Sequence, residues 1–139
     1  MAVLYRFEVF TPYRMFFAEN VESVSLRISD GEIGILAHHS PFIAPVVPGV
    51  LRIKTNTGKW CNAFVASGIL EVTEIKTVLM VDSAEWPEEI DIERVAAAEK
   101  KARINLETAL LKFETDQAKD EIRRSQVRLA VAKMEQPSP

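Results

Sequence analysis

The sequence changes character at one short stretch, Ser83-Ala84-Glu85-Trp86-Pro87. Residues 1–84 hold all five glycines, nine of the eleven aromatic residues and 15 charged residues. Residues 85–139 hold no glycine, two aromatic residues and 22 charged residues. Such a break in composition indicates two regions with different secondary structure. We therefore predict one domain over residues 1–84 and a second over residues 85–139.

The first region consists of short runs of β-branched and aromatic residues. Turn signals such as Ser29-Asp30-Gly31 and Asn56-Thr57-Gly58 separate these runs. The runs predict strands at residues 3–10, 14–18, 21–28, 33–36, 51–55, 60–65, 69–72 and 77–81. Each strand must pair sideways and bury its apolar face on a second sheet, so the pattern predicts an all-β sandwich or flattened barrel without a helix.

The second region is typical of α-helix, because residues 88–136 contain neither glycine nor proline. Asp91 is the predicted N-cap. Residues spaced three and four apart form two seams, Val95, Ala98, Ala102, Leu106, Ala109 and Phe113 in one, and Ala118, Ile122, Ser125, Leu129 and Ala132 in the other.

Small seam residues bury little area, so a hairpin of two such helices is expected to be weakly held. The break between the helices is predicted at residues 112–116, with Thr115 or Asp116 as the N-cap of the second helix. No helix breaker stands there, so a single rod spanning about 65 Å remains the alternative to the hairpin.

Composition excludes several classes of protein. The 139 residues include 17 lysines and arginines against 20 acidic residues, which gives a net charge of −3 and disfavours a nucleic-acid partner. The apolar runs are much shorter than the roughly 20 residues that a bilayer requires. Arg6 and Glu8 interrupt any candidate signal core, and the single cysteine, Cys61, is expected to be a small buried hydrophobe in a reducing compartment.

No catalytic residue and no metal site are predicted. The only histidine pair is His38-His39, and adjacent residues rarely face one metal, so a loop pair that faces solvent or a partner is favoured over a zinc site. Ser40 lacks the surroundings of an activated nucleophile, and Gly31-Glu32-Ile33-Gly34 lacks the helix needed to hold a phosphate. Enzymatic activity that depends on His38 or His39 ranks as the last alternative.

Charged residues form stripes along the helical region. Arg94 and Lys101 lie seven residues apart, and Arg124 and Arg128 lie four apart. In an antiparallel hairpin the two stripes can form a cationic pocket for a polyphosphate. The alternative is a salt-bridged, solvated face, because acidic residues stand three and four positions before Arg124.

Five strings in the chain resemble one known family. The string Gly31-Glu32-Ile33-Gly34-Ile35-Leu36-Ala37-His38-His39-Ser40-Pro41 resembles the pattern Gly-Glu-Leu-Gly-Ile-Leu-Pro-Gly-His-x-Pro of the epsilon subunit of F-type ATP synthases. The other strings occupy residues 7–12, 48–53, 67–72 and 77–85 in matching order. Ala37-His38 stands where the family has Pro-Gly, and Ser67 replaces the first glycine of a Gly-Gly pair.

The resemblance implies a sandwich of about ten strands followed by a C-terminal helical hairpin. It implies a non-catalytic central-stalk subunit of a proton-translocating F-type ATP synthase, which joins the gamma subunit to the c-ring. By this resemblance Gly31 and Glu32 face the c-ring, and His38 and His39 lie near the gamma-facing surface. The implied location is peripheral, on the cytoplasmic face of a bacterial plasma membrane, with a plastid thylakoid membrane as the alternative.

The segment at residues 90–95, Ile-Asp-Ile-Glu-Arg-Val, resembles the Ile/Leu-Asp-x-x-Arg-Ala motif with which some bacterial epsilon subunits bind ATP. Val95 stands in the alanine position, and Lys101 replaces an arginine. No cofactor is implied, and ATP is implied as a regulatory ligand. The implied nucleotide contacts are Glu85, Ile90, Asp91, Arg94, Lys101, Arg124 and Arg128.

The resemblance also implies regulation by the second domain. As a folded hairpin it leaves rotation free, and as an extended tail it reaches the catalytic head and inhibits ATP hydrolysis. The basic residues implied in that inhibitory contact are Lys119, Arg123, Arg124, Arg128 and Lys133. The alternative function is a stand-alone sandwich that binds a small ligand or protein and carries a dimerising helical tail.

Overall fold

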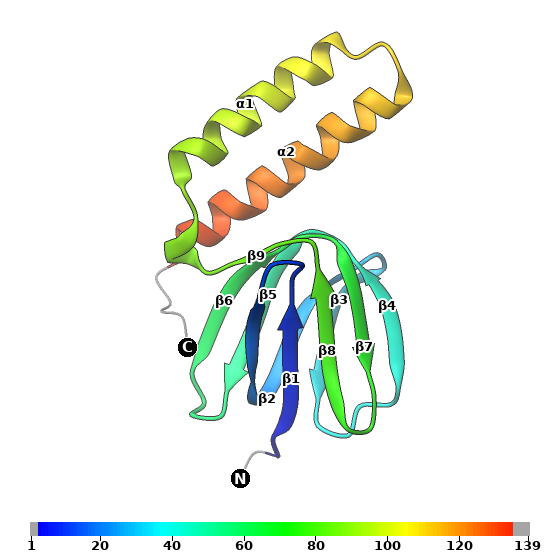
Figure 1. Cartoon of the computed structure of the whole chain (residues 1–139), viewed down its shortest axis with the longest axis vertical. Helices are drawn as coiled ribbons and strands as arrows, with labels where there is room; N and C mark the ends of the chain where they lie inside the picture. The colour runs from blue at the N-terminus through cyan, green and yellow to red at the C-terminus, as the bar shows by residue number, and fades with distance from the viewer. Residues whose placement is uncertain (1–2, 135–139) are drawn as a thin grey trace.

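The computed structural model describes residues 3–134 and consists of a β-sandwich with a helical hairpin at one end (Figure 1). The strands are β1 (Tyr5–Phe10), β2 (Met15–Ile28), β3 (Gly31–Leu36), β4 (Phe42–Val46), β5 (Gly49–Thr55), β6 (Trp60–Val65), β7 (Gly68–Val72), β8 (Lys76–Val81) and β9 (Ala84–Glu85). A 3-10 helix η1 (Pro87–Glu89) leads into α1 (Ile92–Thr108) and α2 (Lys112–Ala132). The predicted sandwich and hairpin are confirmed, with nine strands in the described residues.

The long strand β2 joins the two layers of the sandwich. Its first half pairs with β1, and its second half pairs with β3 and β5. The path β1-β8-β7-β4-β2-β5-β6-β9 continues around the barrel, with β1 and β8 parallel and the other pairs antiparallel. Because β1 pairs with both β2 and β8, the sheet closes on itself and hides most of its edges.

The structure corrects three details of the strand prediction. The predicted strands at 14–18 and 21–28 form one strand of 14 residues, because Glu19 and Asn20 stay paired with β1 and a bulge after Val21 absorbs the irregularity. The strand β4 was missed because Pro45 cannot donate a backbone hydrogen bond, and β4 tolerates this proline on a side that meets β2 only at Val46. The two-residue strand β9 was also missed.

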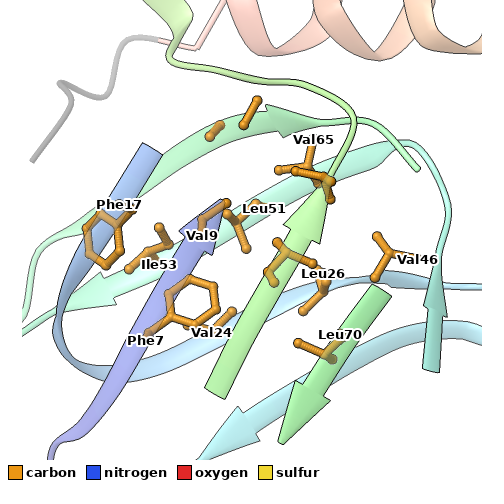
Figure 2. Close-up of a cluster of buried hydrophobic side chains, with 14 of the residues drawn as sticks. Phe7, Val9, Phe17, Val24, Leu26, Val46, Leu51, Ile53, Val65 and Leu70 are labelled. Atoms are coloured by element: carbon orange, nitrogen blue, oxygen red, sulfur yellow. The ribbon is translucent and has the colours of Figure 1, made fainter. Parts of the chain in front are cut away.

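The core lies between the two layers (Figure 2). Alternate residues of each strand point inward, as the period of two requires. Phe7 and Val9 of β1, Leu26 of β2 and Leu51 of β5 are fully buried there. Figure 2 shows these side chains meeting those of Val24, Val46, Ile53 and Leu70.

The buried Cys61 belongs to this core and is 2% exposed. Its Sγ lies 3.7 Å from the backbone oxygen of Ile53, and burial raises the pKa of the thiol to about 11. We expect native Cys61 to react with the thiol reagent DTNB at pH 8 about 100-fold more slowly than an accessible cysteine, because the thiolate is scarce and covered. Stopped-flow absorbance in buffer and in urea measures the ratio, and equal rates would contradict the buried position.

The start of α1 agrees with the prediction, whereas the start of α2 does not. Asp91 is the N-cap of α1, as predicted, and its Oδ1 accepts from the backbone N–H of Arg94 at 3.1 Å. The predicted caps Thr115 and Asp116 are wrong, because α2 already begins at Lys112. The carboxylate of Glu114 accepts from the backbone N–H of Leu110 at 3.3 Å, and this acidic group stabilises the start of α2 without a capping residue.

The two seams meet as predicted over most of their length. Val95 and Ala102 of α1 are buried, as are Ala118 and Ser125 of α2. Phe113 was predicted in the first seam, but it is 66% exposed, because it lies in α2 beyond the turn rather than at the end of α1. The turn between the helices lies at the end of the hairpin that is farther from the sandwich (Figure 1).

The hairpin rests on the sandwich through the C-terminal half of α2, which lies between α1 and the sandwich (Figure 1). Phe64 and Ala66 of the sandwich pack there with Ile90, Val95 and Val131, a set of five buried residues that we call the docking cluster. The main core has twenty-one buried residues in the described part of the chain. Five partly buried residues also pack against the docking cluster: Val50, Val127, Leu129, Ala132 and Met134. Buried apolar area sets the hydrophobic contribution, so we expect the hairpin to be held less firmly than the sandwich itself.

Candidate functional site

The segment that joins the two domains is fixed to the sandwich. Strand β9 pairs with the end of β6, and the ring of Trp86 stacks on that of Phe16 at 4.3 Å between centroids. Arg14 donates to the carboxylate of Glu89 at 2.8 Å and to the backbone oxygen of Ala84 at 3.3 Å. These contacts hold residues 84–89 in place, so a movement of the hairpin must begin after them.

Glu89 is ionised in this arrangement. Burial raises the pKa of its carboxyl group, but the hydrogen bonds from Arg14 and from the backbone N–H of Trp86 outweigh burial, and the pKa lies below its ordinary value. The connecting segment thus carries a charged ion pair beside a stacked pair of aromatic rings.

One side chain of α2 ties the hairpin to β9. Arg128 donates to the carboxylate of Glu85 at 2.7 Å and lies 4.5 Å above the ring of Phe64. A second contact joins Arg128 to the hydroxyl of Ser83 at 3.4 Å. Only about a quarter of the Arg128 and Glu85 side chains is exposed (22% and 27%), so solvent weakens this pair less than a surface ion pair. We call this contact the Arg128 latch.

A cleft of about 420 Å³ lies beside the Arg128 latch, between α1, α2 and the connecting segment. Four of the seven predicted nucleotide contacts line this cleft: Glu85, Asp91, Arg94 and Arg128. Ile90 lies next to it in the docking cluster. The guanidinium group of Arg94 forms no ion pair or hydrogen bond with residues 3–134, so it is available to an anionic ligand.

The structure places the other two predicted nucleotide contacts elsewhere. Lys101 lines a neighbouring hollow of about 500 Å³ between the helices, which shares Ala98 and Glu121 with the cleft. Arg124 donates to Glu121 at 2.5 Å and lines a third hollow on another face of α2. The structure therefore does not bring Lys101 and Arg124 into the cleft that holds the other predicted contacts.

The cleft itself is rich in carboxylates. Glu85, Glu89, Asp91 and Glu121 line it together with two arginines, and the Arg128 latch occupies one of those arginines. An entering polyphosphate must therefore compete with Glu85 for Arg128, and this competition lowers its affinity.

The predicted partner contacts lie at opposite ends of β3. Gly31, with φ of 128°, and Glu32 begin β3 directly after the Ser29-Asp30 turn, at the end of the sandwich that carries the hairpin. His38 and His39 follow the other end of β3 and line a hollow of about 770 Å³. The two sets therefore lie apart from one another, and their assignment to the c-ring and to gamma stays a prediction.

The His38-His39 loop has an unusual backbone. His38 has φ of 65°, in the left-handed region that favours glycine. The Nδ1 atom of His39 lies 2.7 Å from the backbone oxygen of Ser40. Within residues 3–134 no group of three or more His, Cys, Asp or Glu residues is placed to hold a metal ion.

The predicted inhibitory residues all lie on or just after α2. Lys119, Arg123 and Lys133 are exposed, and Arg124 and Arg128 are engaged by carboxylates. In the docked hairpin the Arg128 latch keeps that arginine from other partners, so opening of the hairpin would release it.

No helix among the described residues is long and apolar enough to cross a membrane.

Comparison with known proteins identifies the family. The model of the ATP synthase, Delta/Epsilon chain, beta-sandwich domain matches residues 4–87. The chain belongs to this family. The ATP synthase epsilon chain of Caldicellulosiruptor bescii is 43% identical over 128 residues, which cover 92% of this chain and 93% of that relative. The resemblance to the epsilon family, drawn from five strings, is therefore confirmed over nearly the whole chain.

Two solved assemblies contain a chain of the same fold. One, from Euglena gracilis, is a mitochondrial ATP synthase described as OSCP/F1/c-ring, with a TM-score of 0.80 and 21% identity over 94% of this chain and 82% of that chain. The other is the central stalk/c-ring of the Tetrahymena thermophila mitochondrial ATP synthase, with a TM-score of 0.65 and 14% identity over 95% and 98% of the two chains. At these identities the likeness shows the fold of the epsilon family.

Membership of the epsilon family explains the backbone at His38. The family pattern has glycine at this position, and glycine adopts a positive φ without strain. The chain keeps the left-handed backbone although it carries histidine there. This feature was readable from the sequence as a departure from the family pattern.

Sequence reasoning missed the residues that hold the hairpin in place. Phe64 and Arg14 were not singled out, and Ser83, Trp86 and Glu89 were assigned no contact. Trp86 offered the one usable signal, because a tryptophan among the charged residues of a connecting segment commonly packs on a neighbouring domain. The pairing of Arg128 with Glu85 joins residues 43 positions apart, and no local spacing predicts it.

Proposed function

We propose that this chain is a non-catalytic subunit of the ATP synthase rotor that joins gamma to the c-ring. The family assignment and the sandwich shared with chains of stalk and c-ring assemblies support this role. The chain acts by contact and at the membrane periphery. Glu32 and its turn are the proposed contacts for the c-ring, and His38 with His39 for gamma.

The C-terminal hairpin is the proposed regulatory element. The observation that carries this proposal is the contrast between the docking cluster of five residues and the main core of twenty-one in the described chain. A hairpin held by so few apolar residues and the Arg128 latch can leave the sandwich while the sandwich stays folded. In the open state α2 presents Lys119, Arg123 and Lys133 to an acidic surface of the catalytic head.

Removal of the hairpin tests this regulation. A chain that ends at Ile90 keeps the connecting segment and loses α1 and α2. We expect the assembled complex with the shortened chain to hydrolyse ATP several-fold faster than the complex with the full chain, because the inhibitory element is gone. Steady-state phosphate release measures the difference. Equal rates in the two complexes would show that the hairpin does not inhibit.

The cleft is the proposed site of regulatory ATP. A nucleotide bound only to the docked hairpin stabilises that state by RT ln(1 + [ATP]/Kd), which is about 1.4 kcal/mol at a tenfold excess over Kd. This amount decides the outcome only if the open and docked states are nearly balanced. The small docking cluster is consistent with such a balance.

Calorimetry of the full chain tests nucleotide binding. We expect a saturable heat with ATP at millimolar concentration and at least a tenfold weaker affinity in Arg94→Gln, because the unpaired guanidinium in the cleft is lost. Arg103→Gln is the matched control, since Arg103 lies on the same helix, pairs with Glu99 and does not line the cleft. Absence of heat, or the same loss in both variants, would contradict the site.

A further inference from the structure

A second cavity lies at the junction of the two domains, on a face of α2 that the proposed nucleotide cleft does not use. Its volume is about 320 Å³, and it shares no lining residue with the cleft. We call it the junction pocket. Its polar lining consists of Arg27 and Ser29 from the end of β2, Ser67 from the loop before β7, and Asp120, Arg123 and Arg124 from α2.

The junction pocket gathers positive charge from both domains. Three guanidinium groups line it against the single carboxylate of Asp120. Arg124 is largely neutralised by its ion pair with Glu121. Arg27 and Arg123 form no side-chain hydrogen bond or ion pair with any residue between 3 and 134, although Glu32 stands opposite Arg27 on β3.

This arrangement has a physical consequence for docking. Arg27 belongs to the sandwich and Arg123 to the hairpin, and these two exposed arginines line one hollow at the domain junction. Charges of the same sign at such a junction weaken the docked state. An anion between them would replace the repulsion by two charge-assisted hydrogen-bonded contacts.

We propose that the junction pocket binds a small oxyanion of the phosphate class, inorganic phosphate or pyrophosphate, and that this anion fastens the hairpin to the sandwich. The planar guanidinium groups of Arg27 and Arg123 match phosphate oxygens, and the hydroxyls of Ser29 and Ser67 supply further donors. Asp120 opposes the anion and limits its affinity.

The anion acts as a bridge between a sandwich residue and a hairpin residue, so its binding and docking of the hairpin favour one another. The binding itself does not depend on the role of the chain in the synthase. The effect of phosphate on ATP hydrolysis rests on the proposed function. Bound phosphate would stabilise the docked hairpin and would keep Arg123 and Arg124 from the catalytic head.

A titration of the full chain with inorganic phosphate and with pyrophosphate, at constant ionic strength, tests the proposal. We expect saturable amide shifts in the NMR spectrum at Ser29, Ser67 and Arg123, and slower hydrogen exchange in α2. Arg27→Gln and Arg123→Gln should each weaken binding at least tenfold. Arg52→Gln is the matched control, because Arg52 is an exposed sandwich arginine outside the junction pocket, and its loss should leave the affinity unchanged.

Two further arms separate the alternatives. Arg94→Gln should weaken ATP binding in the cleft at least tenfold and leave phosphate binding intact, so a failure of one site is distinct from a failure of the other. Hexaglutamate is the probe for an acidic peptide, and saturable binding of this peptide without any response to phosphate would overturn the proposal in favour of a protein partner. Absence of a saturable response to both anions, or equal losses in all arginine variants, would also overturn it.

Discussion

Replacement of Val131 by aspartate is expected to release the hairpin and leave the sandwich folded. Val131 is completely buried in the docking cluster, against Phe64 and Ala66. The nearby guanidinium group of Arg128 is already engaged by Glu85, so a carboxylate at this position would be buried among apolar side chains without a free partner. An uncompensated buried charge costs about 3 kcal/mol or more. The docking cluster is too small to absorb that cost, so the hairpin should open.

Amide exchange and NMR shifts measure this release. The amides of α2 should lose protection in Val131→Asp, the shifts around Phe64 should move, and the midpoint of sandwich unfolding should stay within a few degrees. In the assembled complex the variant should hydrolyse ATP more slowly, because the open state is the proposed inhibitory one. Ala130→Asp adds the same charge at the adjacent exposed position and should change little. Equal behaviour of the two variants would contradict the docking geometry.

Gly68→Ala is expected to destabilise the sandwich strongly. Gly68 opens β7 opposite Val81 of β8, and a Cβ atom there would lie 1.9 Å from the backbone oxygen of Met80 and 2.7 Å from the Cα atom of Val81. Both obstacles are backbone atoms of a paired strand, so relief requires the two strands to separate locally. Overpacking of this kind costs about 3 kcal/mol.

Thermal unfolding measures the loss of stability expected in Gly68→Ala. A loss of that size should lower the melting temperature of the sandwich by at least about 10 °C. Gly34→Ala is the matched control, because no heavy atom lies within 4 Å of a Cβ built on Gly34. The control should melt within about 2 °C of the parent chain. Similar melting temperatures for the two variants would show that β7 and β8 do not approach as closely as the structure places them.

The features that the sequence predicted are those that depend on local pattern. The change in composition at residues 83–87 predicted the change from strands to helices, and Asp91 was correctly predicted as a cap because its role depends on the next three residues. The start of α2 was predicted wrongly. Leu110 and Leu111 carry no turn signal, and the glutamate that stabilises this start stands inside the helix.

Long-range placement explains what the sequence left open. Of the predicted nucleotide contacts, Arg94 and Arg128 lie in one cleft, because the helices fold back at residues 109–111. Arg124 lines a different hollow and donates to Glu121, although it stands only one turn before Arg128.

The two sides of the docked hairpin carry different charged contacts with the sandwich. On one side the Arg128 latch attracts α2 to Glu85 of the sandwich edge. On the other side the exposed Arg123 and Arg27 line the junction pocket, where we propose that an anion binds. Ligands that enter either hollow therefore shift the same balance, and the sandwich provides the fixed surface against which the hairpin moves.

Hydrogen exchange of the full chain under native conditions tests directly whether the hairpin leaves the sandwich while the sandwich stays folded. We predict that the free energy of the opening that exposes amides of α1 and α2 is at least about 2 kcal/mol lower than that of the opening that exposes amides of β2 and β5. Addition of ATP should narrow that difference. If the helices instead share the protection of the central strands with and without ATP, the hairpin is a permanent part of the folded unit, and regulation by its release is wrong.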